Sequence, residues 1–376
     1  MEAYLDNSAT TPLCPEAAEA MQEAVGRFWG NPSSLHRFGL EAERLLARCR
    51  ADVAASLRCS PAEVTFTSGG TESNNLALFG AAAALKRRGR RVVTSAVEHS
   101  SIAESAAELQ NRGFEVAYLN VDGQGRVSEQ ELQRLVTKDT ILVSLMAVNN
   151  EVGTIQPIDA VRRVLRQANA PALIHCDAVQ AYGKLPVNPQ RLGVDLLTVS
   201  SHKIHGPKGA GALFVRRGVR ISPILFGGSQ EQKLRPGTEA VPAIAGFAAA
   251  ARAIPDLQQS LQYVTGLRER LVQGLSTMEG VKLNSPPDAL PYLTNISLPG
   301  LQSETMLNFL SERGVYVSSG SACAKGKKSR VLRAMALSDP DIAGALRISL
   351  SRFTTWEEID AFLFALNEAR ISLARK

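Results

Sequence analysis

Short apolar strand patterns alternate with helical patterns between about residues 50 and 215, and this alternation constrains the fold most. Apolar strands that are separated by helices are typical of a mainly parallel sheet with helices on both faces. Such a sheet binds its ligands beyond the carboxyl ends of its strands. The strand patterns cover residues 64–67, 91–94, 115–119, 140–148, 172–176, 196–200 and 212–215, and the helical ones residues 50–58, 72–86, 100–112 and 158–168.

The C-terminal part of the chain has a different pattern. Residues 240–280 are helical and alanine-rich, and a polar, proline-containing stretch at 284–287 interrupts them. The strand and helical patterns that follow predict a smaller α+β domain. In the 376-residue chain we expect a large domain over 16–254, and a small domain formed by 1–15 and 255–376. The later patterns are strands at 294–298, 315–317 and 346–350 and helices at 303–313 and 356–369.

Composition excludes several classes of protein. Hydrophobic residues make up 45% and charged residues 21%, which is typical of a globular chain. Five cysteines in 376 residues exclude a disulfide scaffold and favour a reducing compartment, so we expect a cytoplasmic protein. The basic runs at 86–91 and 325–328 contain no aromatic residue, which predicts solvated surface and no direct contact with nucleic acid. We also expect no targeting segment and no membrane span.

Several familiar motifs are absent from the sequence. No GxxxxGK[ST] phosphate loop, helix-opening GxGxxG, CxxC, HExxH or GxSxG sequence occurs. His202 and His205 have HxxH spacing but lack the further ligand that a zinc site needs. We therefore expect no metal site.

Two polar segments follow predicted strands in a way that suits a cofactor. Residues 68–71 read SGGT between a strand and a helix, and glycines with hydroxyls at a helix N-terminus form a phosphate cup. The alternative is an ordinary helix cap. Asp177 follows a buried strand, where its charge needs a partner such as a protonated ring nitrogen. The alternative here is an N-cap for the next helix.

Lys203 is the third feature that suits a cofactor. It follows the strand pattern at 196–200 and precedes a glycine-rich turn, so it should lie at the same edge of the sheet. Burial lowers the pKa of a lysine and makes it a nucleophile for carbonyls. Taken alone, a surface lysine is the alternative. Together, a phosphate cup, an acid for a ring nitrogen and an imine-forming lysine meet the requirements of pyridoxal 5'-phosphate.

With these residues in place, the sequence resembles the cysteine desulfurases (NifS/IscS-like), which belong to the class V aminotransferase branch of the fold type I pyridoxal-phosphate enzymes. The resemblance covers essentially the whole chain. It implies an α/β fold: a large domain with a mainly parallel seven-stranded sheet between helices, plus a small α+β domain. The matching stretches are 4–12, 31–34, 68–74, 149–153, 177–180, 200–203, 235–238 and 318–323.

The resemblance implies a role for each matching residue around the cofactor. Lys203 should bind the cofactor covalently, and Asp177 should pair with its ring nitrogen. Thr238 should reach the phosphate in a partner subunit, which implies a homodimer with shared active sites. Gly70, Thr71, Ser200 and His202 should bind the phosphate of the same chain.

On the substrate side, the resemblance implies that Asn150 and Gln180 contact the ring hydroxyl and that Asn150 also contacts the substrate. His99 should stack on the ring and assist proton transfer; taken alone, it could be an ordinary satisfied histidine. Arg347 should bind the substrate carboxylate, which suits its bidentate fork.

Cys323 should be the nucleophile. It lies in a Gly/Ser segment, and Lys325, Lys327 and Lys328 would favour its thiolate. The segment after Cys323 resembles the long loop of the housekeeping and nitrogen-fixation desulfurases but is slightly shorter and more basic. Among the other cysteines, Cys49 could be activated by the arginines on either side of it, whereas Cys176 should be buried and Cys14 and Cys59 lie in prolyl turns.

The predicted reaction converts L-cysteine to L-alanine and leaves a persulfide on the enzyme. The persulfide would pass to a sulfur-acceptor protein, such as an iron–sulfur scaffold or a tRNA-thiolation protein, and the basic segment predicts an acidic partner surface. One alternative is a selenocysteine lyase or another enzyme of the class V aminotransferase type. Another is a sulfur-relay or scaffold subunit that has lost catalysis.

Overall fold

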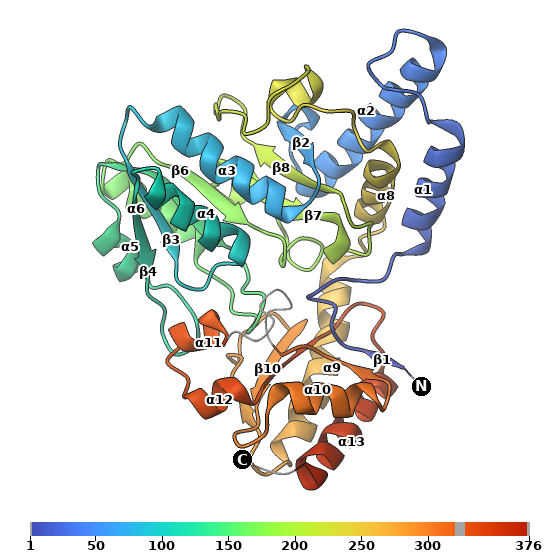
Figure 1. Cartoon of the computed structure of the whole chain (residues 1–376), viewed down its shortest axis with the longest axis vertical. Coiled ribbons are helices and arrows are strands. Elements are labelled where there is room, and N and C mark those ends of the chain that lie inside the picture. Colours follow the sequence, from blue (N-terminus) through green and yellow to red (C-terminus); the bar gives the residue numbers. More distant parts are fainter. Residues whose placement is uncertain (1, 320–327, 374–376) are drawn as a thin grey trace.

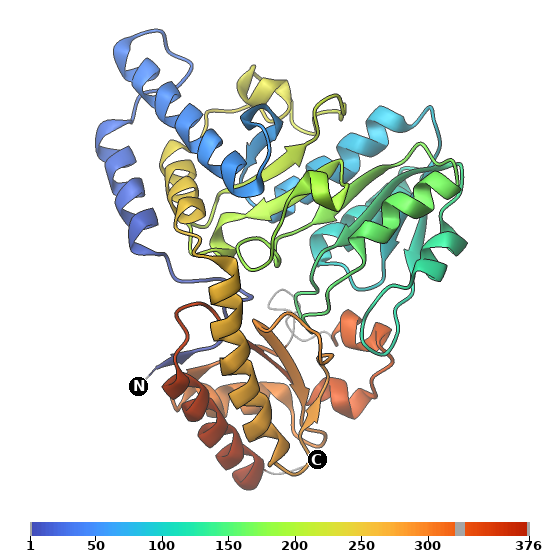
Figure 2. The same cartoon turned by 180° about the vertical axis from the view of Figure 1, so that it is seen from behind.

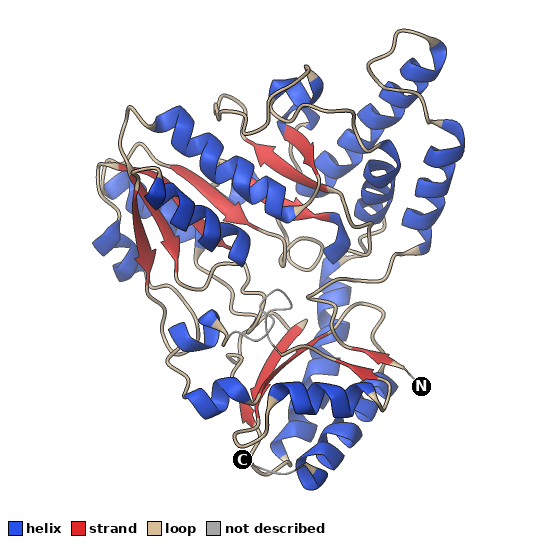
Figure 3. Cartoon of the chain, in the orientation of Figure 1, coloured by secondary structure: helices blue, strands red, loops and turns tan. Residues whose placement is uncertain are grey.

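A computed structural model describes residues 2–319 and 328–373 of the chain. Its largest sheet has seven strands in the order β2-β8-β7-β6-β5-β3-β4 (Figures 1 and 3). Neighbours from β7 through β4 pair in parallel, whereas β8 runs antiparallel to both β7 and β2. The strands are β2 (Val64–Thr67), β3 (Arg91–Ser95), β4 (Glu115–Leu119), β5 (Thr140–Met146), β6 (Leu173–Asp177), β7 (Leu196–Ser200) and β8 (Gly211–Val215).

Helices cover both faces of this sheet, as Figures 1 and 2 show from opposite sides. Helices α3 (Gly70–Leu85) and α4 (Ser100–Asn111) pack side by side on one face. On the other face, α6 (Ile158–Gln167) lies against β5 and β6, and α2 (Arg37–Leu57) and α8 (Val241–Arg252) pack on each other. Strands covered on both faces have no solvent-facing side, and every residue of β2, β5 and β7 is buried. The remaining helices of this part are α1 (Pro15–Arg27), α5 (Glu129–Leu135) and α7 (Pro189–Leu192).

The C-terminal part contains two smaller sheets. Strand β10 (Leu293–Ser297) pairs antiparallel with β12 (Ala345–Ser349) and with β9 (Lys282–Leu283). The N-terminal strand β1 (Ala3–Tyr4) pairs in parallel with β11 (Val315–Tyr316), which brings the start of the chain into this part. The helices here are α9 (Leu257–Ser276), α10 (Ser303–Ser311), α11 (Arg330–Ala334), α12 (Asp339–Ala343) and α13 (Trp356–Ser372). The domain limits that the sequence predicts stay a prediction.

The alternation pattern predicted the strands of the large sheet to within one or two residues at each end, and the mainly parallel α/β class is confirmed. The predicted helix at 50–58 was too short, because α2 begins at Arg37. Its first turns carry exposed Phe38 and Leu40 among charged residues, so the apolar face is interrupted there. The pattern also missed α5 and the two-residue strands β1 and β9, which carry too few residues to show a period. It missed α1 as well, because the only buried residues of that helix are two alanines, Ala17 and Ala24, which give a weak apolar face.

Within the described residues, no helix combines the length and the apolar composition that crossing a bilayer requires.

The close approach of two glycines fixes where β8 begins relative to β2. A Cβ at Gly211 would lie 2.6 Å from the Cα atom of Gly69, which is backbone and cannot rotate away. We therefore expect Gly211→Ala to lower the free energy of unfolding by about 1–3 kcal/mol, because either β8 or the turn that follows β2 must shift. Urea unfolding measures this change. Gly123→Ala is the matched control, since a Cβ there meets nothing within 4 Å and should change stability by less than about 0.5 kcal/mol. Equal stability of the two variants would contradict the prediction.

Candidate active site

A cavity of about 240 Å³ lies at the carboxyl ends of the parallel strands. Segments from distant parts of the sequence meet there: the start of the chain, the turns after β2, β3, β5, β6 and β7, and strand β12. Most of the residues that the sequence nominates line this cavity: Gly70, Thr71, His99, Asn150, Asp177, Gln180, Ser200, His202, Lys203 and Arg347.

The turn between β2 and α3 forms a cup of backbone groups. Gly69 has φ 149°, which a residue with a side chain rarely adopts, and α3 begins directly after it at Gly70. The first N–H groups of a helix have no partner within the helix. The hydroxyl of Ser200 is buried beside this turn and has no hydrogen-bond partner within the described residues. The cup therefore presents several donors to one small volume.

Asp177, the last residue of β6, is held rigidly in the cavity wall. Its side chain accepts hydrogen bonds from Asn74 Nδ2 at 2.8 Å and from the backbone N–H of Val179 at 3.0 Å. Asn74, on α3, also donates to Ser101 Oγ at 2.8 Å. These two donors give the carboxyl group of Asp177 a set orientation in the cavity wall.

Lys203 ends the 3₁₀ turn Ser201–Lys203 after β7. Its amine donates to the backbone oxygen of Ala9 at 2.7 Å and to that of Ser8. The neighbouring His202 shares a hydrogen bond of 3.2 Å between Nδ1 and Thr10 Oγ1. Burial, with further contributions from nearby lysines, lowers the pKa of His202 to about 4, so its ring is neutral near pH 7.

His99 caps the N-terminus of α4, and Nδ1 of its ring accepts the backbone N–H of Ser101 at 3.2 Å. Burial lowers the pKa of His99, although the carboxylate of Asp177 opposes that shift. A neutral imidazole whose Nδ1 accepts a hydrogen bond carries its proton on Nε2. The ring is therefore a donor at Nε2 in the resting protein.

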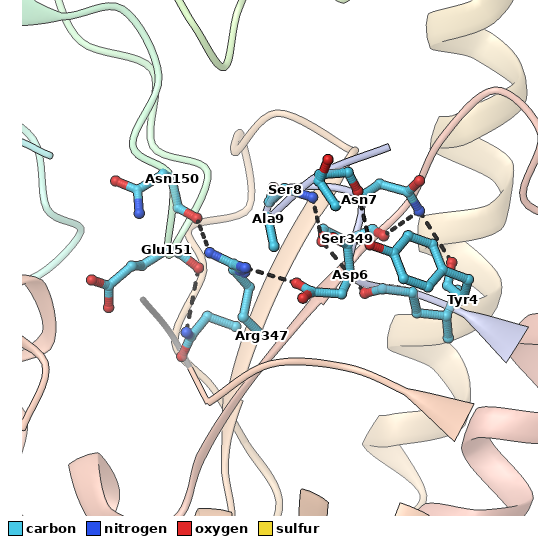
Figure 4. A network of polar contacts seen from close by, with 12 residues as sticks. Tyr4, Asp6, Asn7, Ser8, Ala9, Asn150, Glu151, Arg347 and Ser349 are labelled. Atoms are coloured by element: carbon cyan, nitrogen blue, oxygen red, sulfur yellow. Dashed lines mark hydrogen bonds and ion pairs between the residues drawn. The ribbon is translucent and has the colours of Figure 1, made fainter. Parts of the chain in front are cut away.

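Arg347 lies on β12 at the opposite wall and is 2% exposed (Figure 4). Its guanidinium forms an ion pair of 2.7 Å with Asp6 and donates to the backbone oxygen of Asn150 at 3.0 Å. Its Nε, like Oδ1 of Asn150, is buried without a partner among the described residues. Both residues line the cavity.

The N-terminal segment was not given a role by sequence reasoning, yet it forms one side of the cavity (Figure 4). Asn7 Nδ2 donates to the backbone oxygens of Tyr4 and Ser349, and the backbone N–H of Ser8 donates to Ser349 Oγ at 2.8 Å. These bonds place the carbonyls of Ser8 and Ala9 beside Lys203. The polar stretch at 4–12 was the available signal, but nothing local showed that it would reach the sheet edge.

Two nominated residues need separate mention. Thr238 is exposed and does not line the cavity of its own chain. Cys323 lies outside the described residues, as do Lys325 and Lys327.

The four described cysteines are free and unsuited to nucleophilic chemistry. The expectation that neighbouring arginines could activate Cys49 was wrong: Cys49 is buried, and burial raises its pKa to about 11. Burial likewise raises the pKa of Cys59 to about 12 and raises those of Cys14 and Cys176. None of the four lines the cavity. The described residues also contain no cluster of three His, Cys, Asp or Glu side chains that could hold a metal ion.

The chain also matches known proteins. The family model of the class V aminotransferases matches residues 3–362, so the chain belongs to that family. It is 41% identical over 369 residues to the cysteine desulfurase IscS of Methanosarcina thermophila, covering 97% of this chain and 91% of that protein. It therefore falls among the NifS/IscS-like members of the family.

Solved structures agree with this placement. A NifS-like protein superimposes with a TM-score of 0.94 at 40% identity, covering 99% of this chain and all of that one. A structure described as SspA in complex with cysteine gives a TM-score of 0.83 at 32% identity, over 94% of this chain and all of that one. The fold type I architecture is confirmed.

His175 makes the stability of the folded chain sensitive to acid. It lies on β6 two residues before Asp177, fully buried, between Ser144 Oγ at 2.8 Å and Thr198 Oγ1 at 3.0 Å. Burial lowers its pKa from 6.5 to about 3. Below about pH 6.5 the unfolded chain takes up a proton here that the folded chain does not, so stability falls as the pH falls toward 3.

We expect His175 to lower the free energy of unfolding by about 1.4 kcal/mol for each unit that the pH falls between about pH 6 and pH 4. His175→Gln keeps hydrogen-bonding groups but cannot titrate. Its unfolding should therefore take up about one proton fewer, and its unfolding free energy should change less steeply with pH. Denaturant unfolding at several pH values gives both slopes. An unchanged slope in the variant would show that His175 does not govern acid stability.

Proposed function

We propose that this chain is a pyridoxal 5'-phosphate-dependent cysteine desulfurase, which converts L-cysteine to L-alanine and holds the sulfur as a persulfide on Cys323. The observation that carries the proposal is one cavity in which the amine of Lys203, the carboxylate of Asp177 and the glycine cup come together. The similarity to a desulfurase over almost the whole chain supports the same conclusion.

The residues around the cavity fit this cofactor. The buried hydroxyl of Ser200 needs a partner beside the glycine cup, and a phosphate oxygen would supply it. Gly70, Thr71 and His202 would bind the same phosphate, and His202 would do so through hydrogen bonds because its ring is neutral. Asp177 would hold a proton on the ring nitrogen, and Lys203 would bind the cofactor covalently. When bound, the cofactor supplies an electron sink for the carbon skeleton of the substrate.

Arg347 and Asn150 suit the substrate side. Both residues line the cavity, which in the proposed reaction must hold a charged carboxylate and an amine. Arg347 would bind the carboxylate, since its guanidinium keeps its charge when buried. The ion pair with Asp6 holds the guanidinium in place while it does so.

We propose that Lys203, rather than His99, removes the Cα proton of the substrate. The Nε2 atom of His99 carries a proton in the resting protein, because Nδ1 accepts the backbone N–H of Ser101. His99 would therefore donate a hydrogen bond or stack on the ring. The amine of Lys203 would be the group that moves the Cα proton of the substrate.

Cys323 would take the sulfur. Its thiolate would attack the substrate sulfur, forming an S–S bond as the Cβ–S bond breaks, and the electron pair of that bond would pass to the carbon skeleton that leaves as alanine. Cys323 lies five residues after Ser318 and six before Ser329. Ser318 pairs with the backbone of Arg347, and Ser329 Oγ donates to Glu151 at 2.5 Å, so both anchors adjoin the cavity. Six residues span at most about 20 Å, which keeps Cys323 within reach.

The remaining proposals concern partners. We propose a homodimer in which Thr238 serves the partner's phosphate site, because Thr238 is exposed and lies away from the cavity of its own chain. We also propose transfer of the persulfide to an acceptor protein, such as an iron–sulfur scaffold or a tRNA-thiolation protein. A cytoplasmic location would suit the five cysteines.

Product analysis tests the activity and its two central residues. With L-cysteine and a reductant, the wild type should release alanine and sulfide in equal amounts. Lys203→Ala and Cys323→Ala should each lose at least about 10³-fold in turnover, since each removes a group that forms a covalent bond. Cys59→Ala is the matched control and should keep the wild-type rate. A keto-acid product would favour another aminotransferase-type reaction. Turnover of selenocysteine but not of L-cysteine would favour a selenocysteine lyase. A protein that forms no product and takes up no cofactor would favour a scaffold subunit.

Sedimentation of the holoenzyme tests the dimer, with an expected mass of twice 40.3 kDa. Thr238→Ala should weaken cofactor binding by about tenfold or more, because it removes a hydrogen bond to a charged phosphate. Thr277→Ala, at another exposed threonine, should leave it unchanged. A monomer that binds the cofactor with full affinity would contradict the shared site.

A further inference from the structure

A second lysine is buried next to the cavity and has no role in the reaction described above. Lys184 lies in the turn after β6 and is only 7% exposed. Its amine lies 3.3 Å from Oε1 of Gln180 and 5.7 Å from the ring centre of Tyr292. Among the described residues, no carboxylate forms an ion pair with it. A buried amine without a carboxylate is costly, so its single side-chain hydrogen bond needs an explanation.

That hydrogen bond connects Lys184 to Lys203 through two residues. Nε2 of Gln180 donates to the backbone oxygen of Ser8 at 3.1 Å, and the amine of Lys203 donates to the same oxygen. Ser8 Oγ also lies 3.4 Å from Oε1 of Gln180. The order of contacts is therefore Lys184, Gln180, Ser8 and Lys203.

The donors and acceptors at the two ends decide how the Gln180 amide is oriented. A lysine amine that faces the amide presents N–H groups, so the amide oxygen must face Lys184. A backbone carbonyl can only accept, so the amide nitrogen must face Ser8. Nε2 has two N–H groups and uses one on Ser8 among the described residues. The second remains for a ligand in the cavity that Gln180 lines.

We propose that Lys184 is a positioning residue, which holds the Gln180 amide with its N–H donor toward the ring oxygen of the bound cofactor. This inference rests on the proposed function, since it requires the cofactor to occupy the cavity. The donor would stabilise negative charge on that oxygen. It would therefore lower the pKa of the proton that Lys203 shares with the cofactor.

The contact does not depend on the charge of Lys184. Burial lowers its pKa to about 7, and Lys203 and Arg347 act in the same direction. The ammonium and the neutral amine both carry N–H donors, so the bond to Gln180 persists through that titration. The charged and titratable groups around Lys184 are Lys203, His202, His205, Tyr292, Arg347 and Arg352.

The visible absorbance of the holoenzyme tests the proposal as a function of pH. We expect Lys184→Met, which keeps the length of the side chain but has no donor, to raise the midpoint of the absorbance change by about one pH unit. Lys138→Met, at an exposed lysine, is the matched control and should keep the wild-type midpoint. Lys184→Leu also lacks a donor and provides the same comparison if the methionine variant does not fold. A midpoint equal to that of the wild type in either folded variant would overturn the proposal.

A double variant tests the route through Gln180. Gln180→Leu alone should raise the midpoint, and adding Lys184→Met to it should produce no further shift. A full additional shift would mean that Lys184 acts directly on Lys203, and the proposed route would be wrong. Turnover of L-cysteine is measured separately. A wild type that binds the cofactor but leaves L-cysteine intact would refute the desulfurase proposal, while the absorbance midpoints would still decide the role of Lys184.

Discussion

The buried ion pair between Arg347 and Asp6 is the interaction on which the cavity depends. A guanidinium that is 2% exposed requires a charged partner, and Asp6 supplies it from the opposite end of the sequence at 2.7 Å. The pair holds the N-terminal segment on β12, and the hydrogen bonds of Asn7 and Ser8 to Ser349 fix its register. The carbonyls of Ser8 and Ala9 consequently reach Lys203, so one ion pair positions both the arginine and the surroundings of the lysine.

The electrostatics of the cavity follow from burial and from a few well-placed donors. Burial keeps His99 and His202 neutral, so both act through hydrogen bonds near pH 7. Asn74 and the backbone of Val179 hold the carboxyl group of Asp177 in one orientation. A cavity with one fixed carboxylate, two neutral imidazoles and a lysine amine suits a cofactor that carries a cationic ring nitrogen and an anionic phosphate.

Polar partners also connect the cavity to the segments on either side of Cys323. Ser329 is bonded to Glu151, which directly follows Asn150, and Arg330 donates to the backbone oxygen of Glu98, which directly precedes His99. The start of α11 is therefore attached to the turns that carry two cavity residues. In the proposed reaction, the segment that carries Cys323 would therefore be anchored next to the cofactor site.

The sequence by itself determined the sheet and most of the cavity. Parallel strands are buried on both faces, so their apolar runs are visible locally, and the residues after them must gather at one edge whatever the rest of the chain does. The glycine cup and the positions of Asp177 and Lys203 could be predicted for this reason. Only the tertiary structure placed Ser8 beside Lys203, Asn74 on Asp177 and Lys184 on Gln180, and it reversed the expectation for Cys49. The orientation of a side chain and the pKa of a thiol depend on neighbours tens or hundreds of residues away, and no local pattern records those neighbours.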